Sequence, residues 1–157
     1  MKMGIFWLCA LILSFGGCHG RLTSSEKPSV RPTESDLIGI YRLDEKTLKM
    51  MRDEGGYTNI LETKLVLRPD GTADITNMPD WWGRFGGSNK GYFSGPGKWK
   101  IDRDIGTGNW VIFLYMPNVY QALELIGRKS PYQIFTYVGD PDSGASMTFL
   151  KADDSLP

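Results

Sequence analysis

Hydrophobic and polar residues alternate with a period of two along several short segments of this chain, and that period indicates strands with one buried face. The segment 61–67 is the clearest of them. Its expected inner face consists of Leu61, Thr63, Leu65 and Leu67, and its outer face of Glu62, Lys64 and Val66. The stretch Pro69–Thr72 then predicts a tight turn, because proline presets the first corner and glycine tolerates positive φ. We therefore expect a β-hairpin over residues 61–76, with Ala73 and Ile75 directed inward on the returning strand.

Other segments with strand composition are spread through the rest of the chain. They are residues 37–43, 97–102, 109–116, 132–138 and 145–151. The segment 109–116 is apolar on both faces, which is typical of a central strand, whereas residues 120–126 fit either a strand or a helical turn. Residues 77–96 show no regular period and are expected to be irregular. After the first strand, Asp44 can cap a short helix that continues to Glu54.

The order and spacing of these segments predict the fold class. Residues 37–152 form a stretch of about 120 residues, which is enough for one domain with a single core. Strands joined mostly by short links favour an antiparallel meander, and closure into a barrel would remove the exposed edges. We therefore expect a mainly antiparallel all-β domain, namely a seven- or eight-stranded meander barrel with one short helix after the first strand.

The beginning of the chain has a different pattern. Lys2 precedes an apolar run over residues 5–15, and Gly16-Gly17-Cys18 follows as a small-residue exit. This is the three-part layout of a secretory signal, and the run is shorter than the about 20 apolar residues of a membrane-spanning helix. We expect residues 1–17 to be a signal peptide and the protein to be exported.

The end of that segment, Phe15-Gly-Gly-Cys18, resembles the lipobox of bacterial lipoproteins. The resemblance implies that Cys18 is acylated, by chains such as palmitate, and becomes the mature N-terminus, so that the membrane is one partner of the protein. His19 follows where an aspartate would retain the protein at the inner membrane. This implies sorting to the outer membrane, facing the periplasm, in a cell with two membranes. The alternative is ordinary cleavage nearby, which leaves Cys18 as a free thiol or removes it.

Residues 18–36 are expected to be the lipidated N-terminus and a flexible tether. The stretch 19–36 has two prolines, four serines and almost no apolar residues. Such a composition cannot bury enough surface to offset the entropy of ordering. A flexible chain of this length has a typical reach of roughly 25 Å.

Composition excludes several classes of function from the domain. Cys9 leaves with the leader, Cys18 is modified, and His19 is the only histidine. Disulfides, a cysteine nucleophile, a histidine-containing triad and a His-based zinc site are therefore not expected, and we predict neither a metal nor a cofactor. The 18 Lys and Arg residues balance 18 Asp and Glu residues and form no basic stripe, so nucleic acid is not an expected partner.

The segment 81–99, rich in glycine and aromatic residues, is the best candidate binding surface. Trp81 and Trp82 cannot both face inward from an extended chain, since successive side chains alternate. Tryptophan and tyrosine also suit interfaces, because they combine a large apolar area with a polar group. The candidate binding residues are Trp81, Trp82, Phe85, Tyr92 and Trp99. In the alternative interpretation, the tryptophans and Tyr92 fill the barrel while the glycines permit tight bends.

Two further patterns have simpler explanations. Asp140-Pro-Asp-Ser-Gly144 places two carboxylates near each other, as some calcium loops do, but a plain turn explains the same residues. Catalysis in this domain would need paired carboxylates or a serine activated by lysine, and no motif of either kind stands out. Glu124, within an apolar segment, is the carboxylate whose environment would matter most. We predict no catalytic residue.

The body of the chain resembles the small lipocalin-like barrels found in bacterial lipoproteins. Gly39-Ile-Tyr41 stands where those families often have Gly-x-Trp in the first strand, and the Asp70-Gly-Thr72 hairpin and the final Phe149-Leu-Lys151 strand also fit. The resemblance implies a pocket inside the barrel. A small apolar or sugar ligand there would be flanked by Tyr41, Trp99 and Trp110.

The function expected from these features is that of a lipid-anchored envelope lipoprotein that acts as a non-catalytic binding or interaction module. Its partner would be the small ligand in the barrel or an envelope protein. One alternative is a periplasmic immunity or inhibitor protein directed against an envelope enzyme or toxin. The other is a carboxylate-dependent hydrolase acting on envelope glycans.

Overall fold

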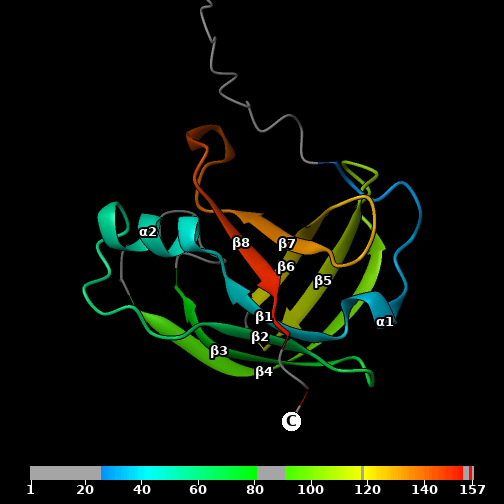
Figure 1. The fold of residues 1–157 in the computed structure, drawn as a ribbon, viewed down its shortest axis with the longest axis horizontal. Helices are drawn as coiled ribbons and strands as arrows, with labels where there is room; N and C mark the ends of the chain where they lie inside the picture. Colours follow the sequence, from blue (N-terminus) through cyan, green and yellow to red (C-terminus); the bar gives the residue numbers. More distant parts are fainter. Residues whose placement is uncertain (1–25, 81–90, 118, 154–155, 157) are drawn as a thin grey trace, which may run out of the picture.

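The computed structural model describes residues 26–80, 91–117, 119–153 and 156, which form a closed antiparallel barrel (Figure 1). Each strand pairs with its neighbours in sequence, and the last strand pairs with the first. The strands are β1 (Gly39–Leu43), β2 (Lys64–Leu67), β3 (Thr72–Pro79), β4 (Tyr92–Arg103), β5 (Trp110–Met116), β6 (Val119–Ile126), β7 (Gln133–Tyr137) and β8 (Ser146–Lys151). The predicted all-β meander barrel is confirmed, with eight strands.

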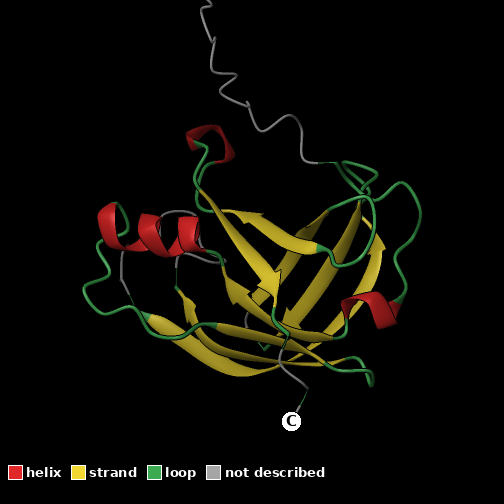
Figure 2. Cartoon of the chain, viewed as in Figure 1, coloured by secondary structure: helices red, strands yellow, loops and turns green. Residues whose placement is uncertain are grey.

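Three short helical segments accompany the barrel (Figure 2): α1 (Glu34–Leu37), α2 (Glu45–Asp53) and the 3-10 turn η1 (Pro141–Ser143). The helix predicted after the first strand is α2, and Asp44 caps it by accepting a hydrogen bond from the backbone N–H of Thr47 at 2.7 Å. Since α2 continues from the end of β1 and α1 precedes its start, the two helices lie at opposite ends of the barrel. Among the helices of the described chain, none combines the length and the apolar composition needed to cross a bilayer.

Side chains directed inward from the strands fill the centre of the barrel. The predicted hairpin is confirmed between Lys64 and Thr76, with Leu65, Leu67 and Ala73 fully buried and Ile75 nearly so. Its first strand is shorter than expected, because β2 begins at Lys64 and not at Leu61, and Val66 on the outer face is also buried. The other strands contribute Tyr41, Ile112, Leu114, Leu123, Leu125, Ile134, Met147 and Phe149, none of which is exposed. Burial of these apolar side chains is the main source of stability, at roughly 25 cal/mol for each Å² removed from water.

The structure corrects the expectation of an irregular stretch over residues 77–96. β3 continues to Pro79 and pairs with the start of β4, with Met78 opposite Phe93. The register shifts between Ile75 and Met78, where Asn77 adopts a positive φ of 49° and donates its N–H to the Ser94 hydroxyl at 2.8 Å. A bulge of this kind interrupts the period of two, which is why the sequence pattern did not reveal the strand.

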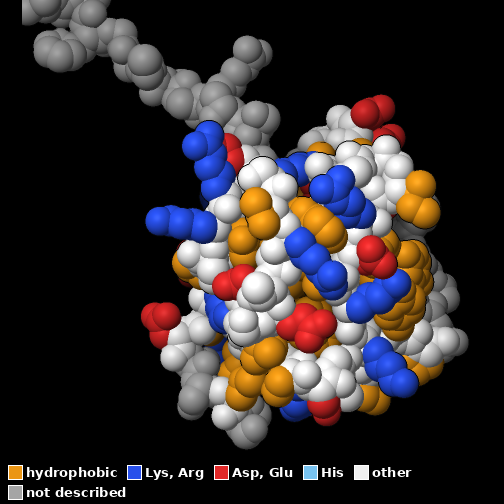
Figure 3. Space-filling view, turned by 90° about the vertical axis from the view of Figure 1, so that its right-hand side faces the viewer, with side chains coloured by type: hydrophobic (Ala, Val, Ile, Leu, Met, Phe, Trp, Pro, Cys, Tyr) orange, Lys and Arg blue, Asp and Glu red, His pale blue; other side chains and the backbone are white. Residues whose placement is uncertain are grey.

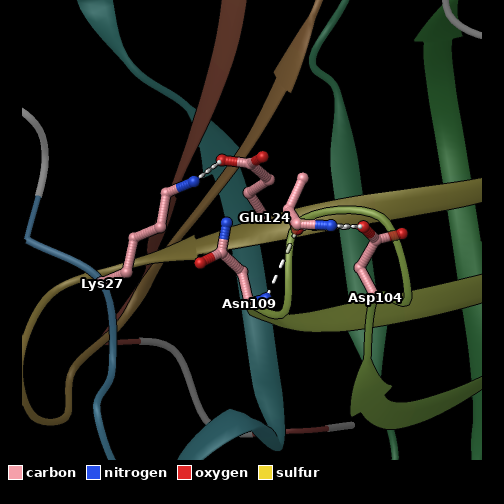
Figure 4. A network of polar contacts seen from close by, with 5 residues as sticks. Lys27, Asp104, Asn109 and Glu124 are labelled. Atoms are coloured by element: carbon pink, nitrogen blue, oxygen red, sulfur yellow. Dashed lines mark hydrogen bonds and ion pairs between the residues drawn. The ribbon is translucent and has the colours of Figure 1, made fainter.

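Residues 26–33, here called the N-terminal strap, lie along the barrel before α1. The carbonyl of Glu26 accepts a hydrogen bond from Gly127 at 2.7 Å, and its carboxylate pairs with Arg128 at 2.5 Å. Lys27 forms an ion pair with Glu124 on β6 at 2.8 Å (Figure 4). From the sequence, these residues are expected to belong to the tether. Since Glu26 already contacts the barrel, only residues 19–25 separate Cys18 from the first described contact.

The helix α1 was not predicted and covers one end of the barrel. It begins with a capping box, in which Thr33 and Asp36 each accept a hydrogen bond from the backbone N–H of the other. The Thr33 hydroxyl also donates to the Asp36 carboxylate at 2.6 Å, and this hydrogen bond, followed by the one from the Thr33 backbone N–H, lowers the pKa of the Asp36 carboxyl. The side chain of Leu37 is fully buried, and Lys151 of β8 donates to the backbone oxygen of Asp36 at 2.9 Å. The helix therefore connects the strap to the β1–β8 seam of the barrel.

Candidate functional site

Three of the predicted binding residues, Trp81, Trp82 and Phe85, lie outside the described residues. The chain that carries them connects Pro79, the last residue of β3, to Tyr92, the first residue of β4. The two described strand ends, Pro79 and Tyr92, are paired with each other at the barrel end that carries α2, and the prediction for the three residues themselves stays a prediction.

The other two candidates, Tyr92 and Trp99, form hydrogen bonds with backbone groups of neighbouring loops. The Tyr92 hydroxyl donates to the carbonyl of Asn59 at 2.8 Å and accepts from the N–H of Leu61 at 3.3 Å. Trp99 is 6% exposed, and its indole N–H donates to the carbonyl of Arg68 at 2.9 Å. These contacts give both side chains a part in holding the loop before β2 and the β2–β3 turn against the barrel.

Tyr41, expected beside an interior pocket, is fully buried beneath α1. Its hydroxyl donates to the carbonyl of Leu37 at 2.8 Å, so the polar group of the ring is satisfied within the fold. Burial raises the pKa of the Tyr41 hydroxyl well above its usual value, and the charge of Asp36 raises it further. The ring packs among the residues of the hydrophobic core.

Tyr41→Phe is expected to lower the free energy of unfolding by about 1 kcal/mol at neutral pH, because one buried hydrogen bond is lost. A tyrosine with a raised pKa in the folded state stabilises the fold fully below its unfolded pKa of about 10, and this contribution is lost as the pH rises above that value. The difference between the native protein and Tyr41→Phe should therefore shrink above pH 10, at on the order of 1.4 kcal/mol per pH unit.

Chemical denaturation at pH 7 to 11 measures this difference. Tyr137→Phe is the matched control, since Tyr137 is 46% exposed on β7, and it should track the native protein at every pH. A difference for Tyr41→Phe that stays constant across pH 10 would contradict the role assigned to its buried hydroxyl.

Trp110, the third residue expected to flank an interior pocket, is in contact with two guanidinium groups. The group of Arg103 is 4.8 Å from the ring centroid, and that of Arg31 in the N-terminal strap is 5.8 Å away. Such cation–π contacts contribute about 0.5–1 kcal/mol each at exposed sites. The buried indole N–H has no hydrogen-bond partner among the described residues. The ring thus serves as a shared packing surface for the strap and the end of β4.

A group of aromatic residues lies on the outer face of β5 and β6, and we call Phe113, Tyr115 and Tyr120 the outer aromatic patch. Tyr115 and Tyr120 are paired across the two strands, and their ring centroids are 5.2 Å apart. Phe113 and Tyr120 are stacked at 5.6 Å with an interplanar angle of 12°. Lys100 places its ammonium 5.5 Å from the Phe113 ring. Tyr115 is 39% exposed and Tyr120 is 58% exposed, so these rings are available to a binding partner.

A surface groove of about 330 Å³ adjoins the patch and shares Tyr115 with it. The groove is lined by Pro96, Gly97, Lys98, Tyr115, Met116 and Pro117. The absence of a side chain at Gly97 allows β4 to approach β5 closely here, because a Cβ atom at this position would lie 2.8 Å from the backbone oxygen of Tyr115. The patch and the groove together form a continuous, mainly apolar surface. Two lysines of β4 border it, Lys100 beside the patch and Lys98 beside the groove.

Comparisons of the chain with protein-family models, with known proteins and with solved structures find no match. The outer aromatic patch was not among the sequence-predicted sites either. Its signal in the sequence is the pair of tyrosines that the β5–β6 register places opposite each other, Tyr115 and Tyr120. The sequence left residues 120–126 open between a strand and a helical turn, so this pairing could not be derived.

The remaining candidates from the sequence have structural partners in the described chain. Asp140 accepts a hydrogen bond from the backbone N–H of Asp142 at 2.9 Å, and Gly144 has a φ of 72°, which is ordinary turn geometry. The Glu124 carboxylate is held by Lys27. Within the described ranges, no three or more His, Cys, Asp or Glu side chains converge in a way that could hold a metal ion.

Proposed function

We propose that this protein is a lipid-anchored lipoprotein of the cell envelope whose barrel binds a protein partner, without catalysis, through its outer surface. The observation that carries the proposal is the outer aromatic patch, with Tyr115 39% and Tyr120 58% exposed beside a groove of about 330 Å³. Large aromatic side chains that remain exposed next to a groove are typical of interaction sites, and tyrosine is enriched among the residues that dominate binding energy.

The packing of the barrel supports a partner outside it over a small ligand inside it. Tyr41 and Trp99, two of the side chains expected around a ligand, use their polar groups for hydrogen bonds within the fold. Four inward-facing residues of β5 and β6, namely Ile112, Leu114, Leu123 and Leu125, are fully buried within the hydrophobic core. A ligand in this part of the barrel would have to displace close-packed side chains, which is costly because protein interiors are packed as densely as organic crystals.

The anchoring part of the proposal rests on the leader, with Cys18 as the acylated residue and the outer membrane, facing the periplasm, as the location in a cell with two membranes. An immunity or inhibitor protein that blocks an envelope enzyme or toxin is one specific form of the proposed function. In that form, the Trp81–Phe85 stretch and the outer aromatic patch are the two surfaces that could contact the partner.

Tyr120→Ala is expected to reduce recovery of the partner about tenfold or more in a crosslinking pull-down from intact envelopes. The reason is that truncation of an interface hot spot typically costs more than 1 kcal/mol, and 1.4 kcal/mol corresponds to a tenfold change in affinity. Leu150→Ala is the control, because Leu150 is 42% exposed on β8, away from the patch.

Parallel Trp81→Ala and Trp82→Ala variants test the other surface. Loss of the partner with these variants, but not with Tyr120→Ala, would move the binding surface to the β3–β4 connection. Unchanged recovery of every crosslinked protein in all the variants would contradict binding through either surface.

A further inference from the structure

The N-terminal strap fixes the place where the tether meets the barrel. Glu26 is held at the β6–β7 loop through its backbone oxygen and its carboxylate, by Gly127 and Arg128. Lys27 extends this attachment to Glu124, and the close-up in Figure 4 shows the pair together with Asn109 and Asp104 of the β4–β5 loop. The start of the strap lies beside the β4–β5 loop in Figure 1. The tether therefore meets the barrel at the end opposite α2.

The length of the tether limits which end of the barrel can face the membrane. Residues 19–25 separate Cys18 from Glu26, which is seven residues. Seven residues span at most about 25 Å when fully extended and about 15 Å as a flexible chain. A strand as long as β5 rises roughly 24 Å along its own axis, and the tilt of about 40° that is usual for barrel strands reduces this to roughly 18 Å along the barrel. If the α2 end faced the lipid, the tether would have to stretch beyond its typical span to pass along the barrel, whereas the end that holds Glu26 is within easy reach.

The β4–β5 loop at this near end displays an isolated apolar side chain. Ile105 is 101% exposed. The loop around it is an ordered turn, in which Asp104 accepts hydrogen bonds from the backbone N–H of Thr107 at 2.8 Å and from its hydroxyl at 2.9 Å. The N–H of Gly108 closes the turn on the carbonyl of Asp104 at 2.8 Å. A rigid turn that presents one isoleucine to the outside, beside the tether attachment, suits insertion into a lipid interface.

We propose that this end of the barrel rests on the lipid surface with Ile105 inserted among the headgroups, so that α2 points away from the membrane. The proposal rests on the acylation of Cys18 proposed above. Figure 3, which shows the molecule from this side, has Lys and Arg side chains interspersed with Asp and Glu. The contact therefore depends on the tether and on apolar insertion, and an uncharged phosphatidylcholine surface is sufficient for it.

Two labelled variants of the full lipidated chain test this orientation. Ile105→Cys and Lys46→Cys, the latter exposed on α2, are each labelled with an environment-sensitive fluorophore and reconstituted on phosphatidylcholine vesicles. We expect the label at position 105 to shift its emission to shorter wavelength and to be quenched by nitroxide-bearing lipids. The label at position 46 should keep the emission it has in buffer. Equal responses at both positions would overturn the proposed orientation.

The parent chain without an introduced cysteine separates this proposal from the anchor itself. If Cys18 is acylated, the parent takes up no thiol label, its N-terminal peptide has the mass of the acylated form, and it floats with the vesicles. Labelling of Cys18 in the parent, together with failure to float, would overturn the anchor and the orientation with it. An acylated parent that floats, while the label at position 105 stays in water, would overturn the orientation alone.

Discussion

Phe149→Ala is expected to lower the free energy of unfolding by about 3–5 kcal/mol, the usual cost of removing a large aromatic side chain from a packed core. Phe149 is fully buried on β8. It pairs with Leu43 of β1 on one side and with Ile134 of β7 on the other, so it lies at the seam that closes the barrel. The cavity left by the substitution would border three strands at once, and urea denaturation monitored by tryptophan fluorescence measures the loss.

Leu150→Ala is the matched control, because Leu150 follows Phe149 on β8, points to the outer face and is 42% exposed. Its unfolding free energy should stay within about 0.5 kcal/mol of that of the native protein. If Phe149→Ala does not fold, Phe149→Leu provides the comparison, with an expected loss of about 1 kcal/mol. Equal stability of the Phe149 and Leu150 variants would contradict the inward placement of Phe149.

Gly97→Ala is expected to destabilise the barrel by about 1–3 kcal/mol, the typical cost of overpacking. The added Cβ atom would lie 2.8 Å from the backbone oxygen of Tyr115 and 3.2 Å from Cγ of Met116. A backbone oxygen in a paired strand cannot move aside without disturbing the β4–β5 ladder, which pairs Lys98 with Tyr115 at this level. Thermal unfolding should therefore show a lower midpoint for this variant.

Gly95→Ala, two residues earlier on the same strand, is the control for this prediction. A Cβ atom there meets nothing within 4 Å. The substitution should be neutral or should stabilise by up to about 1 kcal/mol, since alanine restricts the unfolded chain. If the two glycine variants had the same midpoint, the close approach of β4 and β5 at Gly97 would be refuted.

The elements that were predicted from the sequence are those specified by local residues. The hairpin followed from the alternation in residues 61–67 and from the Pro69–Thr72 turn, and α2 followed from the capping residue Asp44. The elements that were missed depend on local irregularity or on distant partners. α1 has only four residues and one buried side chain, Leu37, so it shows no helical period.

Distance along the chain explains the other missed features. The strap attaches to the barrel through Lys27 and Glu124, which are far apart in sequence. Such a pair produces no periodic pattern of hydrophobic and polar residues from which it could be predicted. The outer aromatic patch depends on the β5–β6 register that brings Tyr115 opposite Tyr120, and register is a property of two strands together. The prediction for Trp81 and Trp82 needed only the alternation of side chains in an extended chain, and it remains a prediction.

The hydrogen-bonded ring from β1 to β8 also limits how a partner can be recognised. Each of the eight strands in the described part of the chain is already paired on both sides, so these strands leave no free edge to which a peptide could add as an extra strand. A partner must instead be selected by side chains. A few substitutions at surface positions could therefore redirect the protein to a different target while the backbone remained unchanged.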